Sequence, residues 1–170
     1  AIPKYVGDRL NSFKSEYEKL YALIRNCNLV IHEMKETDTE MAKACYATAY
    51  TLRGVAYYNL MRLFCEPYNK QKADEQLGLS IVTRFDMEAR PKRSSLQEVV
   101  SLIEEDLKKG ISYNSQSEIY RYTVDVAKAY LARLYFWSQN WEQAIPVAKE
   151  ILEAYPLVEG AEYVEMLSAQ

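Results

Sequence analysis

Residues Thr123 to Pro156 read TVDVAKAYLARLYFWSQNWEQAIPVAKEILEAYP. Apolar residues recur in steps of three and four on both sides of Asn140, and this spacing predicts two amphipathic helices. We expect Thr123 to cap the first helix and Asn140 the second, because such side chains can accept a hydrogen bond from a free backbone amide. A linker of only about three residues separates the helices, which is typical of an antiparallel helical hairpin. The stretch therefore predicts an all-α fold.

The same hairpin follows the tetratricopeptide pattern of roughly 34 residues. Leu131, Ala132 and Tyr135 fall on the first-helix positions of that pattern, Ala144 on its small second-helix position and Pro156 on its final proline. The earlier segment 52–57 is a second, looser copy of the first-helix positions. We therefore expect antiparallel helical hairpins of the tetratricopeptide type, arranged as two irregular repeats.

Two residues depart from the pattern. Lys128 stands where an aromatic residue is common, and Pro146 lies past the first turn of the second helix. A proline inside a helix costs about 3 kcal/mol, because its ring removes one backbone hydrogen bond. We therefore expect the helix that contains Pro146 to start late or to bend.

Two long helices are expected at the start of the chain. Apolar residues at helical spacing predict the first over residues 10–31. The second is expected to begin at a capping box, in which the Thr37 hydroxyl and the Glu40 carboxylate each bond to a free backbone amide. Small and apolar residues continue at helical spacing to Leu63, and Pro67 stops the helix. These two helices should form a hairpin.

A shorter third helix is expected after a long irregular loop. The helical period is lost over about residues 68–93, and loops of that length are often functional. A second capping box within residues 94–98 starts the helix, and Gly110 is expected to end it in the left-handed conformation. The last residues, 163–170, trail off without a clear cap.

Composition excludes several classes of function. The 21 Lys and Arg residues against 24 Asp and Glu give a net charge of −3, without the broad basic field that nucleic-acid binders use. Cys27, Cys45 and Cys65 are far apart, so we expect three small buried residues and no disulfide framework or zinc site. No apolar run approaches the roughly 18 residues of a transmembrane helix. The start of the chain lacks a signal peptide, so the protein is either cytoplasmic or has lost a leader.

No residue is assigned to catalysis, to a cofactor or to a metal. His32 is the only histidine, and we expect it to be a surface or core residue. Glu104, Glu105 and Asp106 are expected on a solvated helix face, because Glu104 and Glu105 point away from each other on a helix. Phosphate-binding glycine loops and the nucleophile elbow lack their defining residues. We therefore expect no enzymatic activity.

The 15 tyrosines and 2 tryptophans are the side chains best suited to stack on the apolar faces of sugars. Those outside or at the ends of the helical stripes are Tyr5, Tyr68, Tyr113, Tyr120 and Trp141. Those at helical spacing, for which core packing is expected, are Tyr57, Tyr58, Tyr130, Tyr135 and Trp137. None of them is assigned to a ligand, so the ligand-binding residues stay unknown.

Several blocks together resemble the SusD/RagB family of surface lipoproteins in Bacteroidetes. The block YEKLYALIRNCN at residues 17–28 looks like the first long helix of that family, and LRGVAYYNLMRLF at 52–64 is similar to its most typical segment. Residues 77–80 and 93–107 look like the loop and capped helix that follow. The hairpin at 127–151 completes the set. Cys65 replaces a glycine that is usual in the family, and Ser80 stands where a proline is common.

The resemblance implies a SusD-like fold and a non-catalytic role in binding an oligosaccharide or other nutrient. It also implies a TonB-dependent receptor as partner and a lipid anchor at the outer-membrane cell surface. Family members carry a leader, a lipidated cysteine and a long C-terminal region. We therefore expect residues 1–170 to be a single helical domain of a longer SusD-like protein. The alternative is a tetratricopeptide-like adaptor that binds a partner peptide or protein.

Overall fold

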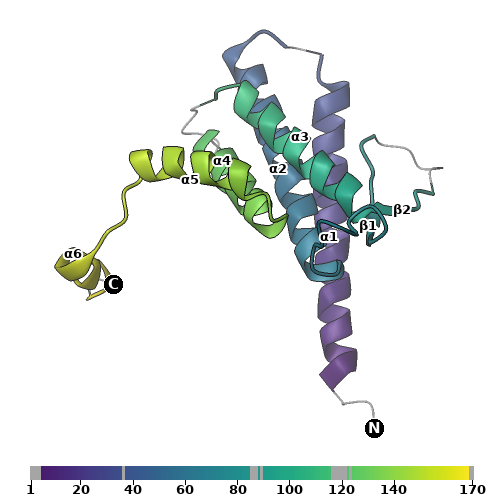
Figure 1. Cartoon of the computed structure of the whole chain (residues 1–170). Coiled ribbons are helices and arrows are strands. Elements are labelled where there is room, and N and C mark those ends of the chain that lie inside the picture. Colours follow the sequence, from purple (N-terminus) through teal and green to yellow (C-terminus); the bar gives the residue numbers. More distant parts are fainter. Residues whose placement is uncertain are drawn as a thin grey trace.

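The computed structural model describes residues 5–35, 37–84, 88, 90–115, 122 and 124–168, with side chains from residue 13 onward. The elements are α1 (Tyr5–Glu33), α2 (Glu40–Phe64), β1 (Leu77–Ser80), β2 (Arg93–Ser95), α3 (Leu96–Ser112), α4 (Val124–Trp137), α5 (Trp141–Ala154) and α6 (Gly160–Ser168). Helix α2 packs between α1 and α3, α4 packs on α3 and α2, and α5 packs on α4 (Figure 1). The helical hairpins confirm the expected all-α fold, to which the structure adds a small two-stranded sheet.

Helix α2 is the central element, and its middle is buried on every side. Residues 53–58 are all buried, and Ala56, Tyr57 and Tyr58 have no exposed surface. A helix that is apolar all round belongs in an interior, because it can bury surface against several neighbours at once. Leu60 of α2, Ile103 and Leu107 of α3 and Leu134 of α4 complete this core and are fully buried. Burying each such side chain contributes roughly 1.5–3 kcal/mol.

One of the two expected capping boxes is confirmed. The Ser95 hydroxyl accepts from the Glu98 amide at 3.2 Å, and the Glu98 carboxylate accepts from the Ser95 amide at 2.7 Å. The box expected at Thr37 is wrong, because α2 begins two residues later and has Thr39 as its cap. The Thr39 hydroxyl accepts from the Ala42 amide at 3.2 Å, while the Thr37 hydroxyl donates to Asp38. Both Thr37 and Thr39 could cap a helix, and the point at which α2 begins to pack decides that Thr39 is the cap.

The expected end of α3 at Gly110 is also wrong. The helix continues to Ser112, and Gly110 lies buried inside it. A side chain at this position would collide with Thr51 Oγ1 and would lie 3.2 Å from the Ala47 carbonyl oxygen. Glycine is therefore required here by the close approach of α3 to α2, and left-handed backbone occurs instead at Asn114.

The α4–α5 hairpin confirms the tetratricopeptide positions. Leu131, Tyr135 and Ala144 are buried between the helices, Ala132 is half-buried, and Pro156 follows α5. Lys128, the first departure from the pattern, forms an ion pair with Glu150 across the hairpin at 2.8 Å.

The caps and the proline of this hairpin differ from expectation. Helix α5 begins at Trp141 and contains Pro146, so of the two expectations, a late start or a bend, the late start is wrong. A proline this near the start removes one backbone bond, while packing on α4 retains the helix. Asn140 occupies the cap position but makes no side-chain cap hydrogen bond, and Thr123 lies outside the described residues.

The connection between α2 and α3 is non-helical, as expected, but it is ordered by a small antiparallel sheet. Leu77 of β1 pairs with Ser95 of β2, and Ser80 pairs with Arg93. The Arg93 side chain also donates to the Gly78 carbonyl oxygen at 2.7 Å. These contacts hold the described parts of the connection against the start of α3.

Helix α6 was not expected, since the end of the chain shows no clear cap. It contacts none of the other elements, and all of its described residues are exposed. Figure 1 shows it apart from the other helices. Across the described residues, none of the helices combines the length and apolar character that a membrane crossing requires.

Candidate functional site

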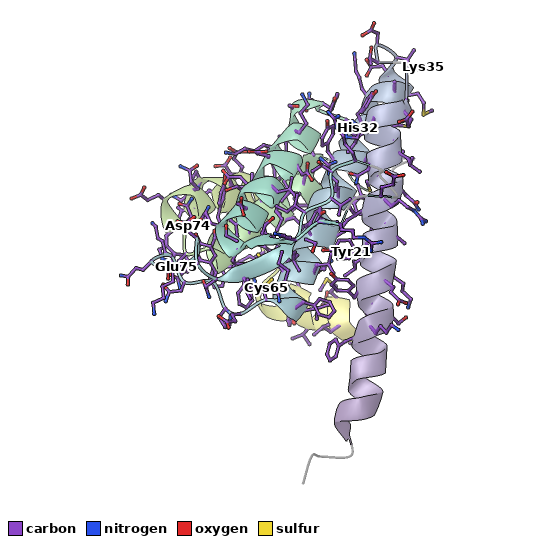
Figure 2. All side chains as sticks on the ribbon, turned by 90° about the vertical axis from the view of Figure 1, so that its right-hand side faces the viewer. Tyr21, His32, Lys35, Cys65, Asp74 and Glu75 are labelled. Carbon is purple, nitrogen blue, oxygen red and sulfur yellow. The ribbon has the colours of Figure 1, made fainter. Side chains whose placement is uncertain are left out.

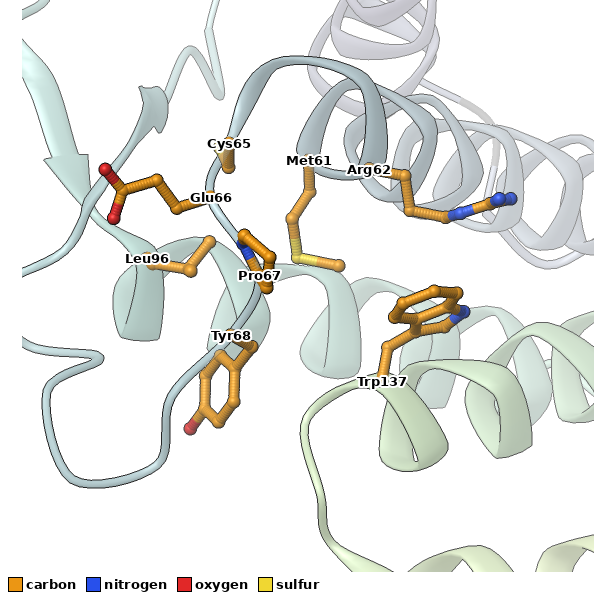
Figure 3. Close-up of a pocket in the computed structure, with 8 residues that line it drawn as sticks. All are labelled: Met61, Arg62, Cys65, Glu66, Pro67, Tyr68, Leu96 and Trp137. Atoms are coloured by element: carbon orange, nitrogen blue, oxygen red, sulfur yellow. The ribbon is translucent and has the colours of Figure 1, made fainter.

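A pocket of about 170 Å³ opens where α2, α3 and α4 end or begin. Its lining residues are Met61, Arg62, Cys65, Glu66, Pro67, Tyr68, Leu96 and Trp137 (Figure 3). Its floor is apolar, because Met61 and Leu96 are buried. Helix α2 ends at Phe64, and the non-helical residues 65–68 that follow line the pocket together with Leu96 of α3, so the pocket is built by the loop as well as by the helices.

The rim of this pocket carries an aromatic ring beside a positive charge. The Trp137 side chain is 47% exposed, and the Arg62 guanidinium carbon lies 5.4 Å from its ring centre. Figure 3 shows Arg62 extending over the indole, while the Glu66 carboxylate points to the opposite side. An exposed indole offers an apolar face, and a guanidinium supplies hydrogen-bond donors. This arrangement suits a ligand with one apolar face and polar edges.

The positive charge at the rim continues along a row of stacked side chains. The Tyr58 ring is contacted by Arg62 at 5.8 Å and by Arg133 at 5.6 Å, measured from guanidinium carbon to ring centre. Arg133 also lies 5.5 Å from the ring centre of Tyr130. Stacking on aromatic faces holds a guanidinium in place and leaves the donors at its edges free.

A second hollow lies between α1 and α2. It measures about 300 Å³, and its lining is mostly apolar, including Leu23, Val30, Met34, Ala49 and Leu52. None of its lining residues is charged, and Asn26 and Thr48 are its polar members, so it offers no charged group that would orient a polar ligand. The pocket at Trp137 is therefore the better candidate for a polar ligand.

A cluster of buried polar groups holds the segment that leaves β1. Val82 is bound twice by the Tyr57 hydroxyl, which accepts from its amide at 2.7 Å and donates to its carbonyl oxygen at 3.1 Å. The Asn28 amide also donates to that carbonyl oxygen at 2.9 Å. Burial raises the pKa of Tyr57 to about 12, so the hydroxyl keeps its proton at neutral pH.

Two residues of α1 complete this cluster. The Tyr21 hydroxyl donates to the Ser80 carbonyl oxygen at 2.9 Å, and His32 Nε2 lies 2.8 Å from the Thr83 carbonyl oxygen. Figure 2 shows both side chains on the side of α1 that faces the rest of the molecule. The segment Ser80–Thr83 is therefore fixed by side chains of α1 and α2.

His32 is an exposed residue with a structural contact, as expected. Within the described ranges, no three His, Cys, Asp or Glu side chains gather as ligands of a metal ion would. Cys27 is buried, and burial raises the pKa of its thiol to about 11. Cys45 and Cys65 are only half-buried, which corrects the expectation that all three cysteines lie in the interior.

The acidic run on α3 is not one solvated face. Glu105 is exposed, but Glu104 accepts from Tyr135 at 2.9 Å and from Lys108 at 2.6 Å. Asp106 is buried and accepts two hydrogen bonds from Arg53 of α2. The expectation is therefore wrong for Asp106, because the partner charge comes from a helix that sequence spacing does not relate to α3.

The aromatic residues divide differently from the sequence expectation. Tyr57, Tyr58 and Tyr135 are buried as expected, and Tyr130 is half-buried, but Trp137 is exposed. The reason is that Trp137 is the last residue of α4 and lies at the rim of the pocket beside Arg62, where neighbouring residues cover its ring only in part.

Of the aromatic residues expected outside the stripes, Trp141 is 51% exposed. Tyr68 donates to Gln97, and Tyr113 stacks on Tyr46. The Tyr5 side chain and the whole of Tyr120 lie outside the described part. The sequence did not indicate that Arg62 and Trp137 line one pocket, because no local pattern relates two residues so far apart in the chain.

Comparison with known families accounts for this arrangement of helices and loop. The family model SusD-like_3, described as "Starch-binding associating with outer membrane", matches residues 5–136. The chain belongs to the SusD-like family. The match covers α1 to nearly the end of α4 and so includes every pocket residue except Trp137.

Solved structures share the SusD-like fold. A putative sugar binding protein from Bacteroides vulgatus is 26% identical with a TM-score of 0.73. The alignment includes 82% of this chain and 32% of that protein. A SusD superfamily protein from Bacteroides thetaiotaomicron is also 26% identical, with a TM-score of 0.76. This alignment includes 86% of this chain and 34% of that protein. A laminarin binding SusD-like protein is 20% identical with a TM-score of 0.64. Here the alignment includes 81% of this chain and 29% of that protein. The chain thus spans about a third of these structures, and no curated protein matches it.

Proposed function

We propose that this chain is the helical part of a non-catalytic carbohydrate-binding component of outer-membrane nutrient uptake. The observation that carries the proposal is the match of residues 5–136 to a starch-binding, outer-membrane-associated family. A 26% identical relative, a putative sugar binding protein from Bacteroides vulgatus, supports the same ligand class. The exposed Trp137 ring beside Arg62 is chemically suited to a sugar, whose C–H face can stack on an indole while its hydroxyls accept hydrogen bonds.

The proposal extends to the place and the partner of the protein. We infer a lipid anchor at the cell surface and a TonB-dependent receptor as the partner that takes up the bound nutrient. The family description supports association with the outer membrane. In this arrangement the helices serve as a scaffold, and binding is performed by side chains at helix ends and loops.

Calorimetric titration of the purified protein with starch and laminarin oligosaccharides tests the ligand class. We expect saturable binding of at least one glycan and no release of reducing ends during prolonged incubation. Absence of binding across a broad glycan panel, together with binding of short peptides, would favour the peptide-binding adaptor instead. Hydrolysis that a single carboxylate substitution abolishes would overturn the non-catalytic role.

Two measurements on the native protein test its place and partner. Detergent-phase partition and intact mass should reveal a lipid-modified N-terminal cysteine, and mild cross-linking in source cells should capture a large β-barrel receptor. A water-soluble native protein without lipid would contradict the surface anchor.

A further inference from the structure

We propose that the pocket at Trp137 binds a saccharide that carries an anionic substituent, with Arg62 as the residue that recognises the charge. The inference rests on the proposed carbohydrate function and names the substrate class of one site. It is carried by the placement of the Arg62 guanidinium beside the Trp137 indole, while Arg133 lies on the same Tyr58 ring but outside the pocket lining.

Arg62 and Arg133 are exposed cations. Among the residues that the structure describes, neither guanidinium forms an ion pair, whereas Arg53 is neutralised by Asp106. Both are held on aromatic rings, with Tyr58 shared between them. A guanidinium stacked in this way keeps its in-plane N–H groups available, and these form paired hydrogen bonds to carboxylate or sulfate oxygens.

The charge and the apolar surface lie within reach of one ligand. Arg62 lies 5.4 Å from the Trp137 ring centre, and Met61, Pro67 and Leu96 line the pocket beside it. A pyranose ring is itself only about 5 Å across, given the bond lengths of covalent chains. Arg62 lies over the Trp137 ring, so a sugar packed against the part of the indole that stays exposed would bring a substituent on its edge near the guanidinium.

The local charges favour an anion although the whole chain carries a net charge of −3. Glu66 is the only acidic residue among those lining the pocket, and Figure 3 shows its carboxylate turned away from Trp137. On the other side of Arg62, a neighbouring hollow is lined by Glu16, Leu20, Asn59 and Leu63. Glu16 there is within 3.2 Å of Lys19, which neutralises it.

Binding of two matched ligand pairs tests the proposal. The first pair is tetragalacturonate and its fully methyl-esterified form, which share a backbone and differ in charge. The second pair is sulfated maltotetraose and maltotetraose, which separates sulfate from carboxylate recognition. We expect at least one acidic ligand to bind about 10-fold more tightly than its neutral counterpart, the size expected of a charge-assisted hydrogen bond at an accessible site.

Two variants with the same loss of charge locate the effect. Arg62→Gln should reduce the preference for the acidic ligand to less than about 3-fold, since it removes the charged donor, and should leave neutral binding nearly unchanged. Arg25→Gln removes an exposed arginine on α1 and should retain the full preference. Trp137→Ala should weaken acidic and neutral ligands alike, because it removes the stacking surface. Circular dichroism confirms that each variant is folded, and Arg62→Lys provides a second variant that keeps the charge.

The outcomes separate this proposal from the broader one. If the protein binds neutral glycans and shows no higher affinity for their acidic counterparts, the inference is overturned and the carbohydrate function still stands. An equal loss of the preference for the acidic ligand in Arg62→Gln and Arg25→Gln also overturns the inference, because it would show a diffuse effect of the protein's charge. Absence of binding to any glycan overturns both proposals.

Discussion

Asp106 of α3 accepts two hydrogen bonds from Arg53 of α2, at 2.8 Å from Nε and 2.7 Å from Nη2, and both side chains are buried. The remaining Arg53 nitrogen, Nη1, donates to Asn28 Oδ1 of α1 at 2.7 Å. This network joins three helices at one point, and Asn28 extends it to the loop at Val82. The pairing with Asp106 raises the pKa of Arg53 against the opposing effect of burial, so the arginine stays charged.

Breaking this ion pair should strongly destabilise the fold. Asp106→Ala leaves the Arg53 charge buried without its partner, and such losses cost about 3–5 kcal/mol. Chemical denaturation of the variant should show this decrease in the free energy of unfolding. The matched control is Glu105→Ala, which removes an exposed carboxylate from the same helix and should change stability by less than about 0.5 kcal/mol. Equal effects of the two substitutions would contradict the structural role of Asp106.

The neighbouring residues Tyr57 and Tyr58 allow the same substitution to be compared at two buried sites. Tyr57→Phe removes the hydroxyl bound to Val82 and should cost about 1–3 kcal/mol, because the Val82 amide loses its partner while the Val82 carbonyl oxygen keeps only the bond from Asn28. Tyr58→Phe should be neutral or stabilising, because the buried Tyr58 hydroxyl has no hydrogen-bond partner in the described part of the chain. Thermal and denaturant unfolding measure both changes. The predicted order is wrong if Tyr58→Phe is the more harmful variant.

Gly110→Ala tests the close approach of α3 to α2. Helix propensity alone predicts a gain of about 1 kcal/mol from this change. We expect instead a net loss of about 1–3 kcal/mol, because the new methyl group overpacks the contact with Thr51. In a Thr51→Ala background the loss should be smaller, since the colliding oxygen is gone. Unfolding free energies of the four proteins give the coupling, and a stabilised single variant would refute the contact.

Cys27 should resist alkylation in the folded protein. Its pKa is raised from 9.0 to about 11, mainly by burial, and only the thiolate reacts. At pH 8 this shift lowers the thiolate fraction about 100-fold relative to the unfolded chain, and burial slows reaction further. Iodoacetamide labelling followed by peptide mass spectrometry gives the rate for each cysteine. Labelling of native Cys27 as fast as in denaturant would show that the thiol is accessible.

The sign of the pH effect follows from the same shift. Because the folded pKa lies above the unfolded value, the neutral thiol contributes stability that is fully present below about pH 9 and is lost as the pH rises to about 11. Cys27→Ser should therefore reduce the fall in stability over that range, which titration of the unfolding free energy measures.

Much of the fold was predictable from local patterns. The α4–α5 hairpin, the capping box at Ser95 and the long helices all follow from spacing and caps within a few residues of one another. These patterns are visible in the sequence because residues three and four apart lie on the same face of a helix. The family resemblance carried by residues 17–28 and 52–64 was also confirmed by the match to the SusD-like family.

The candidate site and the buried charges required the tertiary structure. Periodicity assigns Trp137 to an apolar stripe, but only the packing of α4 on α2 and α3 decides that this ring stays exposed beside Arg62. Asp106 lies in an acidic run that reads as solvated, yet it meets Arg53, which is 53 residues away in the sequence. The sequence by itself determined the helices up to α5 and their hairpins, because these depend on short-range hydrogen bonds and spacing. Which faces are covered, and which charges are paired, depends on contacts between distant segments, and these the tertiary structure alone decided.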